Sequence, residues 1–311
     1  MSVHRMPVII DCDPGVDDAF AIAYAIGSGK ADIQLLSVSA GNTYIDTTIA
    51  NTLHLTELFK SPIPVVQGAD KPLVVDSVYA TWAQSTAGLC GHKYDPKKTK
   101  AKPVPGNVAD VMFDVLKKNG EGQTTLMGIA PMTNIALLLS KYEDAPKYIK
   151  QIVFMGGSRE IVFGVPYREF NIAFDPHAVE IVLKSGIPLV MVPMELGHLA
   201  YLDDDDVKKL SKISTVGEAL AQMTIGYTDF HTAEYGAATH DSTAVAYIAN
   251  PKVLKTEKAN IKLEIVKADD REIAHIAIDF KSKEPNALIC VDIDIDKFKQ
   301  DLFKAIENLP N

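Results

Sequence analysis

Short apolar segments rich in β-branched residues alternate along the chain with longer segments whose apolar residues recur at helical spacing. The first pair is PVIIDC followed by DAFAIAYAIGSG, and pairs of this kind lie at 7–29, 33–59, 123–142, 151–186 and 188–230. Repeated strand and helix signals of this kind predict βαβ units and therefore a mainly parallel sheet. The strand segments are apolar on both faces, as strands buried between two layers of helices are.

The pattern changes near the C-terminus, where IKLEIV, REIAHIAIDF and LICVDIDI follow one another and precede a helical segment at 296–309. Adjacent strand signals without an intervening helix predict an antiparallel meander. The chain shows neither an internal repeat nor a linker. We therefore expect one α/β domain over residues 1–311, with an open, mainly parallel Rossmann-like sheet flanked by helices and a small antiparallel C-terminal extension.

Two polar segments interrupt the alternation. Residues 70–106 form a long connection that contains the basic tract DPKKTKAKPVPG, and residues 158–171 form an insertion between a strand and the helix after it. Long connections inside compact domains are commonly functional. We expect both segments to form walls or lids of a binding site.

Composition and charge exclude several classes of protein. The net charge of −9 leaves no broad basic field, so we expect no nucleic-acid partner. No stretch of about 18 apolar residues occurs, and the N-terminus lacks a secretory pattern, so we expect a cytoplasmic protein that does not span a membrane. The three cysteines are widely separated, which argues against a disulfide framework and against a thiolate zinc site.

The densest polar feature is the sequence DCDPGVDDA, which places Asp11, Asp13, Asp17 and Asp18 directly after the first strand signal. Capping of the following helix would account for one or two of these aspartates. Carboxylates crowded around a tight turn stay ionised only near a cation, and a set of oxygen ligands favours Ca²⁺ or Mg²⁺ over Zn²⁺. The residue types do not distinguish between these two cations.

Two further signals lie downstream. His240 and Asp241 stand just before a short apolar helix, where Asp241 would serve either as a helix cap or as a further carboxylate of the acidic site, with His240 as a proton donor. Glu169 and Asn171 alternate on a segment that we expect to be extended, which would turn both side chains the same way. Such a pair would bind sugar hydroxyls or would simply be solvated.

These motifs together identify a family. The sequence resembles the nucleoside hydrolases of the inosine-uridine preferring type over essentially its whole length. The resemblance is carried, in order, by DCDPGVDDA at 11–19, IAPMTNIA at 129–136, FMGG at 154–157, EFNIAFDP at 169–176 and HDSTAVAY at 240–247.

The resemblance implies a Ca²⁺ site and a ribose site in one pocket. The cation would be held by Asp13, Asp18, Asp241 and the main-chain carbonyl of Ile129. Substrate would be contacted by Asp17, Asn42, Met155, Glu169, Asn171 and Asp241. Asp11 would support the metal loop.

The implied reaction is calcium-dependent hydrolysis of the N-glycosidic bond of ribonucleosides to ribose and free base, by metal-activated water and with inversion. Asp13 would act as the base, Asn42 would orient sugar and water, and His240 would protonate the departing base. Members of the family are commonly homodimers or homotetramers. A non-catalytic nucleoside or sugar binder on the same fold, and a hydrolase for a modified nucleoside, are the alternatives.

Two departures from the family pattern concern the rim of the pocket. Phe163 stands where many members have an asparagine that contacts the 5′-hydroxyl. Many members also have a histidine in the loop before a Gly-Leu pair, and in this chain Gln84 is the residue nearest to that position. Tyr227 and His231, spaced four residues apart on an expected helix, would face the base. The sequence does not decide between purine and pyrimidine nucleosides.

Overall fold

The computed structural model of the protein describes residues 5–162, 164–227, 232, 234–268 and 271–310. Its strands are β1 (Met6–Cys12), β2 (Ala31–Val38), β3 (Val65–Gln67), β4 (Thr124–Gly128), β5 (Ile149–Met155), β6 (Ile161–Val162), β7 (Val165–Pro166), β8 (Leu189–Val192), β9 (Leu254–Ala268), β10 (Arg271–Asp279) and β11 (Ala287–Ile293). Its α-helices are α1 (Val16–Ser28), α2 (Ile45–Leu58), α3 (Thr81–Gln84), α4 (Val108–Asn119), α5 (Thr133–Lys141), α6 (Phe170–Phe174), α7 (Pro176–Leu183), α8 (Glu195–Leu199), α9 (Asp204–Leu210), α10 (Thr215–Met223), α11 (His240–Ala249) and α12 (Ile295–Glu307). Short 3₁₀ turns lie at Pro96–Lys98, Ala145–Tyr148 and Pro251–Val253.

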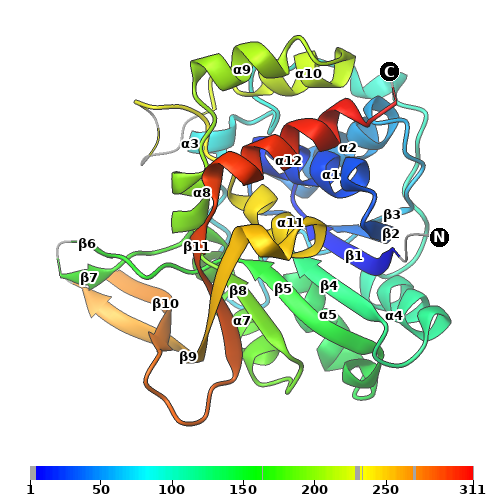
Figure 1. Cartoon of the computed structure of the whole chain (residues 1–311). Coiled ribbons are helices and arrows are strands. Elements are labelled where there is room, and N and C mark those ends of the chain that lie inside the picture. Colours follow the sequence, from blue (N-terminus) through cyan, green and yellow to red (C-terminus); the bar gives the residue numbers. More distant parts are fainter. Residues whose placement is uncertain (1–4, 163, 228–231, 233, 269–270, 311) are drawn as a thin grey trace.

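A nine-stranded sheet runs through the middle of the molecule in the order β10-β9-β11-β8-β5-β4-β1-β2-β3 (Figure 1). The pairings from β11 to β3 are parallel, whereas β9 is antiparallel to both of its neighbours. This confirms the predicted α/β class and the antiparallel C-terminal strands. The meander is continuous with the main sheet because β11 pairs in parallel with β8.

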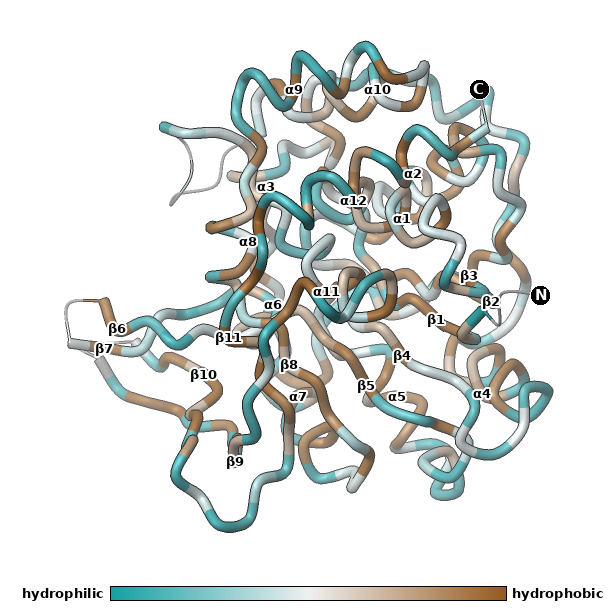
Figure 2. The backbone as a smooth tube through the Cα atoms, in the orientation of Figure 1, coloured by the Kyte–Doolittle hydropathy of each residue, from teal (hydrophilic) through white to brown (hydrophobic). Residues whose placement is uncertain are grey.

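The alternation of side chains along each strand builds a core on both faces of the sheet. In β1, Val8 and Ile10 belong to the core under α1, α11 and α12, whereas Ile9 belongs to the core under α4, α5 and α7. All three side chains are fully buried. The central strands are accordingly hydrophobic along most of their length, and polar positions concentrate on the outer helices and turns (Figure 2).

The strand order reverses beside β1. From β1 the chain moves to β2 and β3 on one side, and it then returns to add β4, β5 and β8 on the other. In open α/β sheets, such a reversal leaves a crevice beyond the carboxyl ends of the strands. The predicted helical stretch near 203–230 is in fact two helices, α9 and α10. Among the described residues, no helix combines the length and the apolar character needed to cross a membrane.

Candidate active site

A cavity of about 160 Å³ lies beyond the carboxyl ends of the central strands. The six residues that the resemblance assigns to substrate contact all line it, namely Asp17, Asn42, Met155, Glu169, Asn171 and Asp241. Ile129, at the end of β4, and His240, at the start of α11, line the same cavity. The structure therefore brings together residues from five separate sequence motifs.

The turn between β1 and α1 is organised by Asp18. Its Oδ1 accepts a hydrogen bond from the Asp13 N–H at 3.0 Å, and its Oδ2 accepts one from the Gly15 N–H at 3.0 Å. Gly15 is the N-cap of α1, so Asp18 occupies the third helical position and reaches back to the cap. Helix capping thus explains one of the four aspartates, as the pattern allowed.

Asn42, just after β2, ties this turn to the neighbouring strand. Its main-chain N–H donates to Asp13 Oδ2 at 2.6 Å, and its side-chain Nδ2 donates to Asp18 Oδ2 at 3.0 Å and to the Asp13 carbonyl at 3.2 Å. Asp13 Oδ1 is buried and has no hydrogen-bond partner among the described residues. Asn42 therefore holds one oxygen of the Asp13 carboxylate, and the other oxygen is able to bind a ligand.

Asp11 lies deeper, in the strand itself. Its Oδ1 accepts hydrogen bonds from Ser37 Oγ at 2.7 Å and from Asn134 Nδ2 at 2.8 Å, and Asn134 Oδ1 in turn accepts from the Ala69 N–H at 2.8 Å. These bonds connect β1, β2 and the start of α5. The sequence analysis singled out the motif that contains Asn134 but not the asparagine itself, which lies in the first turn of α5, on the connection that follows β4.

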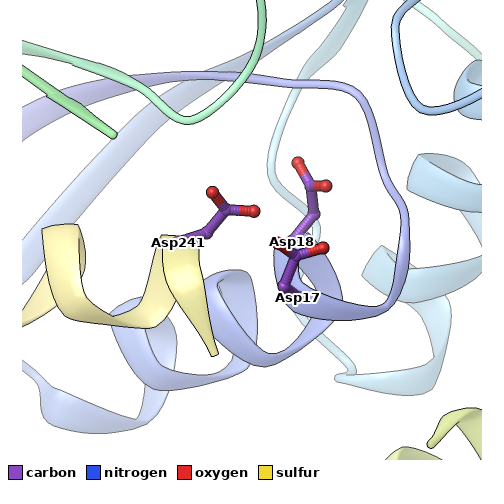
Figure 3. A group of neighbouring side chains, drawn as sticks. All are labelled: Asp17, Asp18 and Asp241. Atoms are coloured by element: carbon purple, nitrogen blue, oxygen red, sulfur yellow. The ribbon is translucent and has the colours of Figure 1, made fainter. Parts of the chain in front are cut away.

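Asp17, Asp18 and Asp241 form the closest group of carboxylates. One oxygen from each lies within 4.8 Å of the others, and all three residues are buried. Figure 3 shows Asp241, from the first turn of α11, pointing toward Asp17 and Asp18 at the start of α1. The two helices are distant in sequence and pack side by side.

The electrostatics of this group favour neutralisation of its negative charge, by protons or by a bound cation. Burial, followed by repulsion from Asp17, raises the pKa of Asp18 to about 8. Burial and the neighbouring carboxylates also raise the pKa values of Asp13 and Asp241 well above the usual range. The opposing influences on Asp13 and Asp18 are hydrogen bonds from neutral groups. A bound cation would neutralise the charge that burial makes so unfavourable.

The donor set fits a hard divalent cation. Asp17, Asp18 and Asp241 offer converging carboxylate oxygens, and Asp13, whose N–H donates to Asp18, adds a buried Oδ1 atom that has no partner among the described residues. Carboxylate and carbonyl oxygens are the ligands of Ca²⁺ and Mg²⁺ in proteins. Ile129 lines the cavity next to this group, where the expected carbonyl ligand would be.

His240 is held by the loop after β8. Its Nδ1 lies 3.1 Å from the Met194 carbonyl, and since a carbonyl oxygen only accepts, Nδ1 is the donor in this hydrogen bond. The ring also packs edge-on against His198, with the ring centroids 4.9 Å apart. Proton exchange with a ligand therefore falls to Nε2 of His240.

Glu169 and Asn171 both line the cavity, but our expectation of an extended segment was wrong. Glu169 is the N-cap of α6, and its two carboxylate oxygens accept hydrogen bonds from the N–H groups of Asn171, Ile172 and Gly157 at 2.8, 3.0 and 2.9 Å. A side chain that satisfies the first turn of a helix stabilises that helix over the extended form. Asn171 Nδ2 donates to the Met155 carbonyl at 3.3 Å.

Both predicted wall segments border the cavity. Segment 70–106 contributes Val78, Ala80, Trp82, Ala83 and Gln84, and segment 158–171 contributes Tyr167, Arg168 and Phe170 in addition to the two residues above. Tyr227 also lines the cavity. Phe163 and His231 lie outside the described residues. Gln84, which the resemblance placed at the rim of the pocket, donates a hydrogen bond to Asp17, a contact between residues 67 positions apart that no local pattern indicates.

Comparison with known proteins agrees with this geometry. Residues 8–300 match the family model of the inosine-uridine preferring nucleoside hydrolases. A pyrimidine-specific ribonucleoside hydrolase, RihA, from Enterobacter sp. (strain 638) is 35% identical over 298 residues, which cover 93% of this chain and 94% of the relative. The structure of a purine-preferring ribonucleoside hydrolase from Gardnerella vaginalis superimposes with a TM-score of 0.87 and 25% identity, covering 97% of this chain and 98% of the other. The structure of a plant nucleoside hydrolase, PpNRh1, has the same fold, with a TM-score of 0.86 and 23% identity over 97% of this chain and 99% of the other. The chain belongs to the inosine-uridine preferring nucleoside hydrolase family, and it is a ribonucleoside-hydrolysing enzyme.

Proposed function

We propose that the protein hydrolyses the N-glycosidic bond of ribonucleosides in a calcium-dependent reaction that releases ribose and the free base with inversion at the anomeric carbon. The observation that carries this proposal is the convergence of the Asp17, Asp18 and Asp241 carboxylates beside a cavity that Asp17, Asp241 and His240 line. A binding protein without catalysis has no need for both a buried base and a proton donor. The paired acid and base therefore favour the enzyme over the binder.

Asp13 is the proposed general base. Its Oδ2 is held by the Asn42 N–H, while the buried Oδ1 has no partner among the described residues and is able to accept a proton from the attacking water. Asn42 thereby orients the base as well as the turn. When bound by Asp13, Asp18, Asp241 and the Ile129 carbonyl, Ca²⁺ would polarise the water and orient the ribose hydroxyls.

Ribose binding falls to the polar side chains around the cavity. Asp17, Asn171 and Asp241 present oxygens and an amide to the sugar hydroxyls, while Glu169 and Met155 lie at its 5′ side. Cleavage of the glycosidic bond builds positive charge on the ribose ring. Buried carboxylates stabilise that charge more strongly than water does, because the surroundings are less polarisable.

His240 is the proposed general acid. The Met194 carbonyl fixes Nδ1 as a donor, so the protonated ring delivers the proton on Nε2 to the departing base. A base that leaves with a proton is a better leaving group than its anion. The reaction thereby divides proton removal and proton delivery between Asp13 and His240.

We further propose that pyrimidine ribonucleosides are the better substrates. The relative named as pyrimidine-specific shares 35% identity with this chain, whereas the structure named as purine-preferring shares 25%. Tyr227 and Trp82, which line the cavity, are the side chains that we expect to face the base. We also propose a homodimer or homotetramer, which light scattering coupled to gel filtration would test.

The experiment is a measurement of reducing sugar released from inosine, adenosine, guanosine, uridine and cytidine, before and after chelation and after Ca²⁺ is restored. The proposal requires release that is lost on chelation and returns with Ca²⁺, with uridine and cytidine the faster substrates. Failure of every nucleoside, in folded protein that binds Ca²⁺, would favour a binder or a hydrolase for a modified nucleoside. Release that survives chelation would overturn the calcium dependence.

A further inference from the structure

Gln84, the last residue of α3, connects a distant loop to the carboxylate group. Its side chain is 3% exposed and lines the cavity. Its Nε2 donates to Asp17 Oδ1 at 3.0 Å, and its Oε1 accepts from the Val16 N–H at 2.9 Å. One amide thus spans two consecutive residues at the start of α1.

The chemistry of the two partners fixes the orientation of this amide. The Val16 N–H only donates and an ionised Asp17 only accepts, so Oε1 and Nε2 of Gln84 cannot exchange places. The side chain also lies directly over the turn, because a Cβ built on Gly15 would come within 2.6 Å of Gln84 Cδ. Gln84 therefore holds one oxygen of the Asp17 carboxylate in a defined position.

The backbone that presents Gln84 is itself constrained. Ser85 has φ 59° and ψ 168°, a backbone conformation that residues other than glycine rarely adopt. The surrounding contacts must therefore stabilise it. Thr43 Oγ1 donates to the Thr86 carbonyl at 3.2 Å, and Asn51 Nδ2 donates to the carbonyls of Ala87 and Pro14 at 3.0 Å each. Asn51 thus holds the Gln84 loop and the carboxylate turn together.

We propose that Gln84 is a positioning residue for the reaction, which holds the Asp17 carboxylate in the conformation that converges with Asp18 and Asp241. This proposal rests on the function proposed above. Loss of the amide would remove a hydrogen bond that holds Asp17 Oδ1 against the repulsion from its two like-charged neighbours. Correct placement of a ligand group by fractions of an ångström is worth a large factor in rate.

A simpler role for Gln84 is to accept the hydrogen bond of the buried Val16 N–H at the start of α1. That role predicts a loss of stability when the amide is removed, with no effect on catalysis or cation binding. The two roles therefore make different predictions for variants that remain folded.

The test compares wild type, Gln84→Met, Gln84→Glu and the control Gln300→Met, whose glutamine is exposed on α12. Circular dichroism establishes folding, steady-state kinetics with uridine give kcat and KM, and titration calorimetry gives the dissociation constant for Ca²⁺. For Gln84→Met we expect kcat/KM to fall about 10- to 100-fold, the factor that one hydrogen bond to a charged group supplies, and Ca²⁺ affinity to fall with it. The control should match wild type in both.

The pH dependence of kcat/KM in Gln84→Glu is a second test, because a purely structural role of Gln84 predicts no such dependence. The introduced carboxyl repels Asp17 when ionised but donates a hydrogen bond to it when protonated. The ratio of its kcat/KM to that of wild type should therefore rise as the pH falls from 8 to 6, whereas the same ratio for Gln84→Met should stay flat.

Separate outcomes overturn the two proposals. A folded Gln84→Met with wild-type kcat/KM and wild-type Ca²⁺ affinity would show that Gln84 only caps α1. A wild-type protein that binds Ca²⁺ but releases no ribose would contradict the proposed function, and the Ca²⁺ affinities would still test Gln84. A wild-type protein with neither activity nor Ca²⁺ binding would contradict both.

Discussion

The buried carboxylates should make the cation-free protein less stable as the pH rises from 6.5 to 8. Burial raises the pKa of Asp18 to about 8, whereas an aspartate in an unfolded chain titrates near about 4. Between these values the folded protein holds a proton that the unfolded chain has released. The stability contributed by this proton is fully present below pH of about 4 and is lost as the pH rises through about 8.

The size of the effect follows from linkage. Each proton held only by the folded state contributes a slope of about 1.4 kcal/mol per pH unit, so Asp18 alone lowers the free energy of unfolding by about 2 kcal/mol between pH 6.5 and 8. Asp13 and Asp241 act in the same direction because burial raises their pKa values as well. His54 acts in the opposite direction, because burial lowers its pKa to about 4. Its effect on stability changes mainly between about pH 4 and about pH 6.5, so it adds little to the slope between pH 6.5 and 8.

The assay is urea unfolding followed by circular dichroism at pH 6.5, 7.25 and 8, in protein freed of divalent cations and in protein with saturating Ca²⁺. Bound Ca²⁺ keeps the carboxylates ionised, so its stabilising effect should grow with pH. Asp18→Asn should reduce the slope of the free energy of unfolding against pH by about the amount that one proton contributes. The control is Asp204→Asn, at an exposed position in the first turn of α9, which should leave this slope unchanged. A free energy of unfolding that is flat or increases over this range in cation-free wild type would refute the reasoning.

Three substitutions test individual roles. Asp13→Ala should abolish measurable turnover while the far-ultraviolet circular dichroism stays native, and a normal kcat would exclude Asp13 as the base. His240→Ala should slow uridine far more than a riboside with a nitrophenolate leaving group, which needs no proton; equal losses on both would contradict the acid role. Gly197→Ala would place a Cβ 2.2 Å from His240 Nδ1 and 2.6 Å from its Cα, so α8 and the start of α11 must move apart; we expect the ring to shift from the Met194 carbonyl and kcat to fall about 10-fold, and unchanged kinetics would contradict this.

The layers of the fold were predictable because both faces of the central sheet are buried. Successive residues of β1, such as Ile9 and Ile10, enter different cores, so the strand is apolar throughout and stands out against the helices. The continuity of the C-terminal strands with the main sheet was not predictable. It depends on the pairing of β11 with β8, a contact between segments about a hundred residues apart that leaves no local pattern.

The segment at 169–171 was predicted to be extended, but hydrogen bonds to the Glu169 side chain favour a helix instead. The alternating pattern around EFN is compatible with an extended segment, but the Glu169 carboxylate satisfies three main-chain N–H groups when the chain turns into α6. One of these groups belongs to Gly157, on another loop, so the preference for a helix is partly set by tertiary structure. Local periodicity does not contain that information.

The side chains that support the site share a chemical character that clarifies how it would work. Asn42, Gln84 and Asn134 bind the carboxylates through amides, and Ser37 does so through a hydroxyl, with main-chain N–H groups as the other donors. A lysine or arginine in any of these places would form a stronger pair with an aspartate, but it would also neutralise the charge. Neutral donors fix the positions of the carboxylates and leave their combined negative charge for a cation and for the positive ribose of the transition state. Because these donors are neutral, the carboxylate charge in the cation-free site is uncompensated and unfavourable at neutral pH. The pH dependence of stability and the proposed catalysis therefore have one physical origin.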